Sequence, residues 1–408
     1  MSGAPPDAAW LNALIGLLQS SQLALLRLLH ALGLVDTVHG QPAWPWARRF
    51  SGEYLLIDIG QARHLAITLA LLAGVLALLL AALFWRRRRW WLLALVPLVL
   101  VLAPWPEARV VLVPAHPTSF HVPPASLSVA SIVQGRALYV QHCVACHGAD
   151  GRGQGPLAVD QPVWPPNLAG PLLWRRADGD LLWAVLHGTR DRKGRTTMQG
   201  HAAHLSDVDA WAALDFLRAQ AAGEMLRATG SWMLPVALPD VAVRCGAQAP
   251  RALSSWRGQR VRVVAAASAG SDAASMAVQD VREDPRLVTV WLRPPAAPAA
   301  PTASNALPAR ADCVADDAEA WSSFALIAGA QSLDGAQFLA DRDGWLRARS
   351  QPGKAGWSED DLVCRTDVAP RTGPSAAASG ALPADGLGAL ITLMDAEPVR
   401  FVKGGFVH

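Results

Sequence analysis

The stretch Cys143-Val144-Ala145-Cys146-His147 decides the fold of the middle of this chain, and a glycine-rich run from Gly148 to Pro156 follows it. A Cys-x-x-Cys-His run is the attachment signature of c-type haem, in which two thiols bond to the vinyl carbons and the imidazole binds the iron. The cysteines must then lie on one turn, with the histidine next so that its ring reaches the iron. The spacing predicts one covalent haem c held by Cys143 and Cys146, with His147 as an axial ligand.

Two other interpretations of a Cys-x-x-Cys pair fit the surroundings less well. A redox dithiol usually sits between a strand and a helix, and a zinc knuckle needs a second pair of ligands. The sequence around Cys143 and Cys146 offers neither context. Haem attachment is therefore the interpretation that we carry forward.

The composition indicates membrane segments and argues against some partners. The chain has 408 residues, enough for two or three domains, and 52% of them are hydrophobic. Because long polar stretches are also present, the apolar residues must be concentrated in places, which predicts membrane spans. A net charge of +3 gives no reason to expect a nucleic-acid partner. Five cysteines are too few for a disulfide scaffold.

The longest apolar run extends from Leu65 to Phe84, which in a helix just crosses a bilayer core of about 30 Å. Four consecutive arginines, 86 to 89, follow it between tryptophans, and a second apolar run continues from Leu92 to Ala103. The second run is short and contains Pro97, so flanking tryptophans would help it to reach across. Together the runs predict a transmembrane helical hairpin with a tight loop.

The arginine cluster predicts the orientation of the hairpin. Cytoplasmic loops carry the positive charge, so everything after Pro104 should lie outside the cytoplasm. Haem c is attached on that side of the membrane in bacteria. Both arguments place the later domains on the periplasmic side of a bacterial inner membrane.

The segment from Trp10 to Val35 is predicted to form an amphipathic helix. Its polar side chains fall on one half of the helical wheel and are opposed only by Ser21. Such a helix can lie in the membrane interface or pack into a bundle, and both alternatives stay open. His30 and His64 are candidate buried ligands, although solitary histidines on apolar helices are more often structural.

Two helices are expected to frame the haem pocket. The segment from Ile132 to His142 precedes the cysteine pair and carries Gly135 on its apolar face. Downstream, Ser206 is a natural N-cap with Asp209 three residues later, so a second helix should begin there. The two helices would cross near the glycine.

A sixth iron ligand is expected from the loop before the second helix. A thioether favours reduced iron and raises the potential, and Met198 is the only methionine between the haem signature and that helix. His201 and His204 lie close by, and either could take its place and lower the potential. A short helix from Leu181 to Leu186 is predicted ahead of this loop.

Residues from Gly135 to Arg218 resemble a class I, mono-haem cytochrome c in their order of helix, haem-binding run, glycine-rich loop, methionine and final helix. The resemblance implies thioether bonds from Cys143 and Cys146 and axial ligation by His147 and Met198. It also implies one-electron transfer. The chain departs from the family in the residue after the methionine, which is glutamine where proline is common.

A weaker resemblance concerns copper. The stretch from Ala115 to Phe120 resembles bacterial fusions in which a copper resistance protein D-like membrane region carries a cytochrome c. That family has more membrane spans, so copper transport is not carried over. His116 and His121 are spaced as possible copper ligands, but histidines in a proline-rich linker are more often only linker. Copper stays a possible partner.

The last third has the pattern of a mixed α/β unit. The expected elements are strands at 261–266 and 287–292, helices at 275–282 and 318–328, and a hairpin over 337–348 with Asp-Gly at its turn. This order resembles the thioredoxin-like fold from about Leu234 to Asp367. Where the active family has a Cys-x-x-Cys pair, residues 268–272 contain no cysteine, so dithiol exchange is not expected. A disulfide between Cys313 and Cys364 is expected, with Cys245 as an alternative partner.

The predicted fold is multidomain: a helical membrane hairpin, an all-α cytochrome c domain and an α/β thioredoxin-like domain. The expected function is one-electron transfer with redox partner proteins, by a carrier rather than an enzyme. The alternatives are a copper-handling or oxidase-assembly factor that uses the haem as sensor or reductant, and a small redox enzyme with an open iron position. The expected regions are an amphipathic N-terminal region (1–63), the hairpin (64–106), a linker (107–128), the cytochrome c domain (129–222), the thioredoxin-like domain (223–371, with a Pro/Ala-rich insertion at 294–312) and a flexible tail (372–408).

Overall fold

The structure is a computed structural model of the whole chain. The residues that it describes are 9–55, 58–85, 87–232, 234–266, 281, 284–294, 311–350, 356–364 and 386–399. The expected helix at 275–282 and most of the Pro/Ala-rich insertion fall outside these ranges, and every structural statement below refers to the residues within them.

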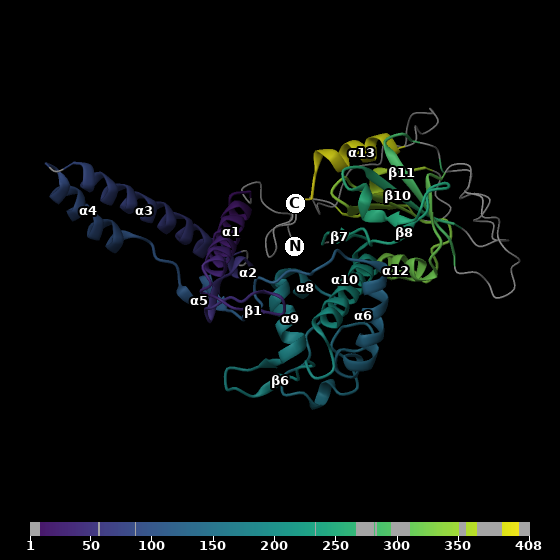
Figure 1. Cartoon of the computed structure of the whole chain (residues 1–408), viewed down its shortest axis with the longest axis horizontal. Helices are drawn as coiled ribbons and strands as arrows, with labels where there is room; N and C mark the ends of the chain where they lie inside the picture. The colour runs from purple at the N-terminus through teal and green to yellow at the C-terminus, as the bar shows by residue number, and fades with distance from the viewer. Residues whose placement is uncertain are drawn as a thin grey trace, which may run out of the picture.

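Helices form the N-terminal half and the middle of the molecule (Figure 1). In chain order they are α1 (Ala9–Ala31), α2 (Gly52–Leu55), α3 (Ile59–Phe84), α4 (Arg89–Leu102), α5 (Ala108–Val111), α6 (Val129–His142), α7 (Val144–His147), α8 (Leu172–Arg175), α9 (Asp178–His187), α10 (Asp207–Thr229), α12 (Ala318–Ala328) and α13 (Leu387–Ala396).

The strands form one six-stranded sheet in the C-terminal part and four two-stranded ribbons elsewhere. The sheet order is β12-β11-β10-β13-β14-β7, with β10, β11 and β12 parallel and the remaining pairs antiparallel. The strands are β1 (Thr37–Val38), β2 (Gln41–Pro42), β3 (Arg48–Phe50), β4 (Leu112–Pro114), β5 (Thr189–Arg190), β6 (Thr196–Met198), β7 (Val236–Ala237), β8 (Ala242–Val243), β9 (Arg251–Ala252), β10 (Arg260–Ala265), β11 (Leu287–Leu292), β12 (Cys313–Ala315), β13 (Gln337–Ala340) and β14 (Trp345–Ser350).

Helices α3 and α4 pack against each other as a hairpin that projects away from the rest of the molecule (Figure 1). They contain the two apolar runs, and the arginines Arg87 and Arg88 form the turn between them. By length and composition, the segments Trp10–Ala31 and Ile59–Phe84 could cross a bilayer, whereas α4 is shorter. These features weakly suggest an association with a membrane.

The segments before and after the hairpin fold together. Strand β3 pairs antiparallel with β4, so both ends of the hairpin connect to the same small ribbon. The guanidinium of Arg49 forms an ion pair of 2.7 Å with Asp180 on α9, and both side chains are about nine-tenths buried. The hydroxyl of Thr118 donates to the carbonyl of Gly179. Residues 107–128, expected as a linker because of their prolines, are therefore held by β3 through β4 and by α9 through Thr118.

The predicted pair of framing helices is present. Both α6 and α10 begin with a capping box, and that of α10 is formed by Ser206 and Asp209 as expected. The helices cross at Gly135, where a Cβ atom would overlap the carbonyl oxygen of Ala212. Only glycine permits this close approach, because any side chain would push the two backbones apart.

Helix α10 also joins the haem part of the chain to the C-terminal sheet. It runs to Thr229, beyond the expected boundary at residue 222, and its second half packs against α12. A Cβ atom at Gly223 would overlap the carbonyl oxygen of Leu326. One continuous hydrophobic core extends from Ile132 in α6 to Phe338 in β13. The boundary between the two parts is thus packed, because one helix serves both.

The sheet confirms the strands expected at 261–266 and 287–292, the helix at 318–328 and the hairpin over 337–348. The short strand β12 was not expected. The tail predicted to be flexible contains α13, which is a correction. Its buried side chains Leu390 and Met394 pack with Leu339 of the sheet, and α13 covers one face of it (Figure 1).

A buried arginine holds the end of α13. The side chain of Arg347 in β14 is fully buried and donates to the backbone carbonyls of Met394 and Glu397. The last carbonyls of a helix lack partners within it, and a cation there also complements the helix dipole. Arg347 of β14 thus caps the C-terminal end of α13, a contact that the composition of the tail did not indicate.

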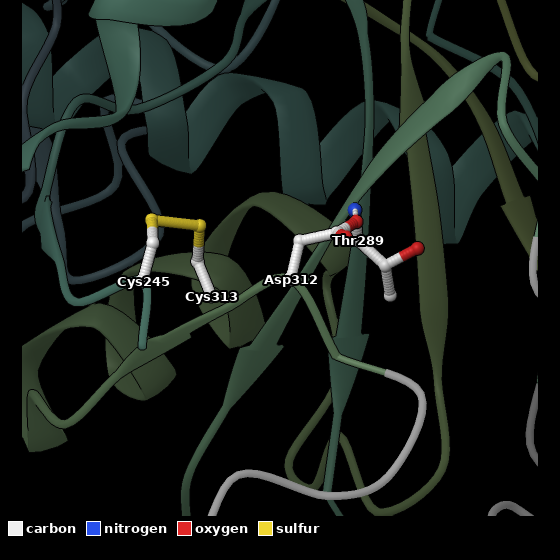
Figure 2. The surroundings of a disulfide bond; sticks show 4 residues. All are labelled: Cys245, Thr289, Asp312 and Cys313. Atoms are coloured by element: carbon white, nitrogen blue, oxygen red, sulfur yellow. Dashed lines mark hydrogen bonds between the residues drawn. A yellow bond between two sulfur atoms is a disulfide. The ribbon is translucent and has the colours of Figure 1, made fainter. Parts of the chain in front are cut away.

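The disulfide links Cys245 to Cys313 at the start of β12, beside Asp312, whose carboxylate accepts a hydrogen bond from the backbone of Thr289 (Figure 2). The expected bond between Cys313 and Cys364 is therefore wrong, and the alternative partner is correct. Cys364 is buried and is not part of a disulfide. Backbone hydrogen bonds between residues 244 and 314 bring the two bonded cysteines together.

Candidate haem site

The Cys-x-x-Cys-His run forms a single helical turn directly after α6. The carbonyl of Cys143 accepts hydrogen bonds from the backbone N–H groups of Cys146, at 3.2 Å, and His147, at 2.9 Å. Gly148 ends the turn with a positive φ of 77°, a conformation that glycine adopts without strain. The two cysteines and the histidine therefore lie on one turn, as the spacing predicted.

The glycine-rich run folds back over this turn. The backbone N–H of Gly153 donates to the carbonyl of His147, and that of Gly155 to the carbonyl of Cys146. A Cβ atom at Gly155 would overlap the carbonyl oxygen of Ala145. The run needs glycine here because its backbone lies directly against the turn.

Both framing helices hold this loop in place. The hydroxyl of Tyr139 on α6 donates to the carbonyl of Gly148 at 2.7 Å. The amide of Gln220 on α10 donates to the carbonyl of Ala149 at 2.6 Å. The buried environment raises the pKa of Tyr139, so the phenol stays protonated and keeps its role as a donor. The turn is fixed by side chains from residues far apart in the sequence.

The ring of His147 is buried, and burial lowers its pKa, with the positive charge of His201 acting in the same direction. The carbonyl of Pro166 opposes this shift, but its geometry falls short of a hydrogen bond, and Nδ1 has no partner among the described residues. A metal-bound histidine must be neutral and usually donates its other ring N–H to a carbonyl. His147 therefore suits an iron ligand, with Pro166 as the group beside its second nitrogen.

The thiols of Cys143 and Cys146 are free and half-buried. Burial raises the pKa of Cys143 to about 11, and the neighbouring Cys146 contributes in the same direction. Such a thiol is a poor nucleophile at neutral pH, which does not favour a redox dithiol. The donor set of two free thiols and one neutral imidazole on one turn fits covalent haem.

Met198 lies at the end of β6, opposite Thr189 of β5. Glycines hold this ribbon against the end of α9, since a Cβ atom at Gly188 would overlap the carbonyl of Met198 and one at Gly200 would lie 2.5 Å from that of Leu186. The position of Met198 is thus set by close backbone packing. Its role as sixth ligand stays a prediction.

Three histidines gather beside the haem turn. The ring of His142 lies 5.7 Å from that of His201 and 6.0 Å from that of His204. Burial lowers the pKa of His201, as do the charges of His142 and His204. The sequence suggested His201 and His204 as alternative ligands, but it gave no sign that His142 would join them, because α6 and the loop are sixty residues apart.

The other candidate histidines are dispersed. His116 stacks on Trp183, and His121 is buried with Nε2 near the carbonyl of Pro42. His30 and His64 are exposed, so they are not buried ligands. Within the described ranges, no group of three or more histidine, cysteine or acidic side chains is placed to hold a metal ion. The two histidines considered for copper thus have structural surroundings.

Comparison with known sequences supports the haem interpretation. Residues 132–221 match the family of cytochrome c. This part of the chain is a cytochrome c domain, and such a domain carries covalently bound haem c and transfers electrons. The matched range begins in α6 and ends in α10, so it contains the cysteine pair, His147 and Met198.

Searches of curated proteins found no match. Among solved structures, the chain is 24% identical to a reducing HAO-like protein complex, Kustc0457/Kustc0458, of Kuenenia stuttgartiensis, with a TM-score of 0.20 and coverage of 30% of this chain and 56% of that one. It is 15% identical to the exposed lipoprotein thioredoxin Etrx1 of Streptococcus pneumoniae, with a TM-score of 0.23 and coverage of 30% and 94%. The chain spans little more than half of the Kuenenia protein.

Proposed function

We propose that this protein is a membrane-anchored c-type cytochrome that transfers one electron at a time through a single haem. Cys143 and Cys146 would hold the haem, and His147 and Met198 would be the axial ligands. The observation that carries the proposal is the single turn on which two thiols outside any disulfide and a buried imidazole lie together. The haem iron would supply the redox chemistry, and the chain would supply the thioether bonds and the axial ligands.

The hairpin of α3 and α4 is the proposed anchor. The pairing of β3 with β4 keeps both of its ends on the side of the cytochrome c domain, as two crossings require. The arginine turn lies at the opposite end and would be cytoplasmic. The cytochrome c domain and the C-terminal sheet would then lie on the periplasmic side of a bacterial inner membrane.

The C-terminal domain is proposed to be thioredoxin-like without dithiol activity. Its parallel β10 and β11, antiparallel β13 and β14, and flanking helices support the fold assignment. Its cysteines form one disulfide, Cys245–Cys313, and one buried thiol, Cys364. Because the sheet shares its core with α10, we propose that the domain braces the haem pocket.

A haem stain of the denatured protein and a reduced-minus-oxidised spectrum test the proposal. The parent should carry one covalent haem per chain, and the Cys143→Ser/Cys146→Ser variant should carry none. Met198→Ala should keep the haem but show an altered ferric spectrum and a lower potential. Met225→Ala, which changes a methionine of α10 outside the proposed ligand set, is the control. Absence of covalent haem from the parent in cells with a working attachment system would contradict the proposal.

Carbon monoxide distinguishes a carrier from an enzyme with an open iron position. A firmly ligated Met198 should prevent the reduced parent from binding carbon monoxide without denaturant, whereas Met198→Ala should bind it. Rapid binding by the parent would favour the enzymatic alternative. Bound copper in stoichiometric amount, lost on changing His116 and His121, would instead favour the copper-handling alternative.

A further inference from the structure

Helix α1 has three different faces. One face is buried: Leu11, Ile15 and Leu18 pack in a cluster with Leu65 of α3 and Val111 of α5. A second face is apolar but exposed, and a third is polar. A surface helix of a soluble protein typically has a buried apolar face and an exposed polar face, without an exposed apolar face between them.

The exposed apolar face is large. Leu17 and Leu28 are 62% and 56% exposed, and they lie on the same side of the helix with Ala24 between them. Arg27 and His30 lie on a different side and are also exposed. Leucines on one exposed side and charged groups on another match a helix that lies between hydrocarbon and water.

The packing partners of α1 locate it at one level of the hairpin. The hydrophobic cluster contains Ala62, Leu65, Ala66 and Leu69, which are the first turns of α3, and nothing further along that helix. Figure 1 shows α1 crossing the base of the hairpin instead of running alongside it. A third membrane span would contact α3 along its length, so the packing argues against a span.

The C-terminal half of α1 lies at the same level of the hairpin. The buried side chain of Gln22 accepts a hydrogen bond from the backbone of Phe50 in β3, which pairs with β4 at the end of the hairpin. Both halves of α1 are therefore held near the place where the hairpin begins. On α3, Ile59 and Ile67 are exposed large apolar side chains in the same first turns that pack against α1.

We infer that α1 lies in the plane of the membrane interface, on the side of the cytochrome c domain, with Leu17 and Leu28 in the boundary between headgroups and acyl chains. The occupant of the apolar face is therefore lipid. This inference rests on the proposed membrane hairpin and adds a second, in-plane contact to it. Two contacts that cross each other would fix the orientation of the cytochrome c domain relative to the bilayer.

Fluorescent labelling can test the inference on the full haem-loaded chain. The haem takes Cys143 and Cys146, the disulfide takes two more cysteines, and Cys364 is buried, so an introduced cysteine is the accessible thiol. An NBD label is placed at Leu17→Cys or Leu28→Cys and, as controls on the polar face, at Arg27→Cys or His30→Cys. Leu76→Cys, exposed in the middle of α3, reports on the hairpin itself.

The labelled proteins are reconstituted in phosphatidylcholine vesicles with lipids that are spin-labelled near the headgroup. We expect blue-shifted emission and at least twofold stronger lipid quenching at positions 17 and 28 than at 27 and 30. Equal quenching by aqueous iodide on both faces would overturn the inference. So would blue-shifted emission without lipid quenching, since a second protein copy would then cover the face.

The Leu76 label separates the inference from the function on which it rests. Quenching by lipids spin-labelled deep in the acyl chains at position 76, with water-like labels at 17 and 28, would leave the anchor intact and overturn only the placement of α1. A water-like label at 76 would contradict the membrane anchor itself. The haem spectrum, measured on the same samples, reports on haem attachment and iron ligation independently of either result.

Discussion

Gly135 shows how much a single residue decides in this protein. The haem turn is held by Tyr139 of α6 and Gln220 of α10, so the distance between these helices sets the pocket. The two helices can approach this closely because residue 135 is glycine. A Cβ atom at this position would overlap the carbonyl oxygen of Ala212.

Gly135→Ala should destabilise the cytochrome c domain by about 1–3 kcal/mol, since the two helices must separate to make room. Denaturant unfolding followed at the Soret band of the haem measures this. Gly170→Ala is the matched control, because the nearest atom to its added Cβ is 3.7 Å away. Equal stability of the two variants would contradict the close crossing.

The buried side chain of His121 should make the unfolding free energy depend on pH. Burial lowers its pKa, with a smaller contribution in the same direction from His39. The folded state then binds fewer protons than the unfolded one, so stability is fully present above the unfolded pKa of about 6.5 and is lost as the pH falls towards the folded value.

His121→Gln should therefore flatten the fall in unfolding free energy between about pH 7 and pH 5, by at most about 1.4 kcal/mol per pH unit. Hydrogen exchange of residues 112–121 across this range measures the local effect. The comparison with the parent cancels the contributions of the other buried histidines. An unchanged pH slope would show that His121 is not the group responsible.

At the scale of elements, α13 completes the C-terminal sheet. Its residues lie far beyond β14 in sequence, yet Leu390 is fully buried against Leu339 and Trp357. The sheet would otherwise expose one apolar face, because α12 covers the other.

Leu390→Ala should cost about 2–5 kcal/mol in the unfolding free energy of this domain, through lost burial and the cavity left behind. Thr392→Ala changes an exposed position of the same helix and should stay within about 0.5 kcal/mol. Denaturant unfolding followed by tryptophan fluorescence compares them. A mild effect at Leu390 would mean that α13 is only loosely attached.

At the scale of the whole molecule, buried contacts tie the membrane-proximal segments to the cytochrome c domain. The ion pair of Arg49 and Asp180 joins β3 to α9, and Ser119 donates to the same carboxylate. Removing one partner of a buried pair leaves the other charge uncompensated, which costs far more than losing an exposed pair.

Asp180→Ala should destabilise this contact by about 3–5 kcal/mol. Residues 37–50 and 112–121 should then exchange amide hydrogens much faster, while the haem spectrum is kept. Asp191→Ala, which breaks an exposed pair with Arg195, should leave exchange in these residues unchanged. Protection that survives in Asp180→Ala would mean that the segments are held by other contacts.

The sequence by itself determined the local features whose signals lie within one element. The spacing of Cys143, Cys146 and His147 gave the haem turn, because one helical turn is all that the chemistry requires. The apolar runs predicted α3 and α4, and Ser206 predicted the start of α10. Both signals are local, because the length of an apolar run and a helix cap depend only on residues close together in the sequence.

Only the tertiary structure decided the features that join distant parts of the chain. These are the disulfide partner of Cys313, the attachment of α13, the ordering of residues 107–128 and the meeting of His142 with His201. Each of these features depends on which surfaces come into contact when the helices and the sheet pack. The residues next to a position in the sequence do not indicate which distant surface it will contact. The buried arginines Arg49 and Arg347 lie at such contacts between distant segments, since a charge is buried only where its partners come together.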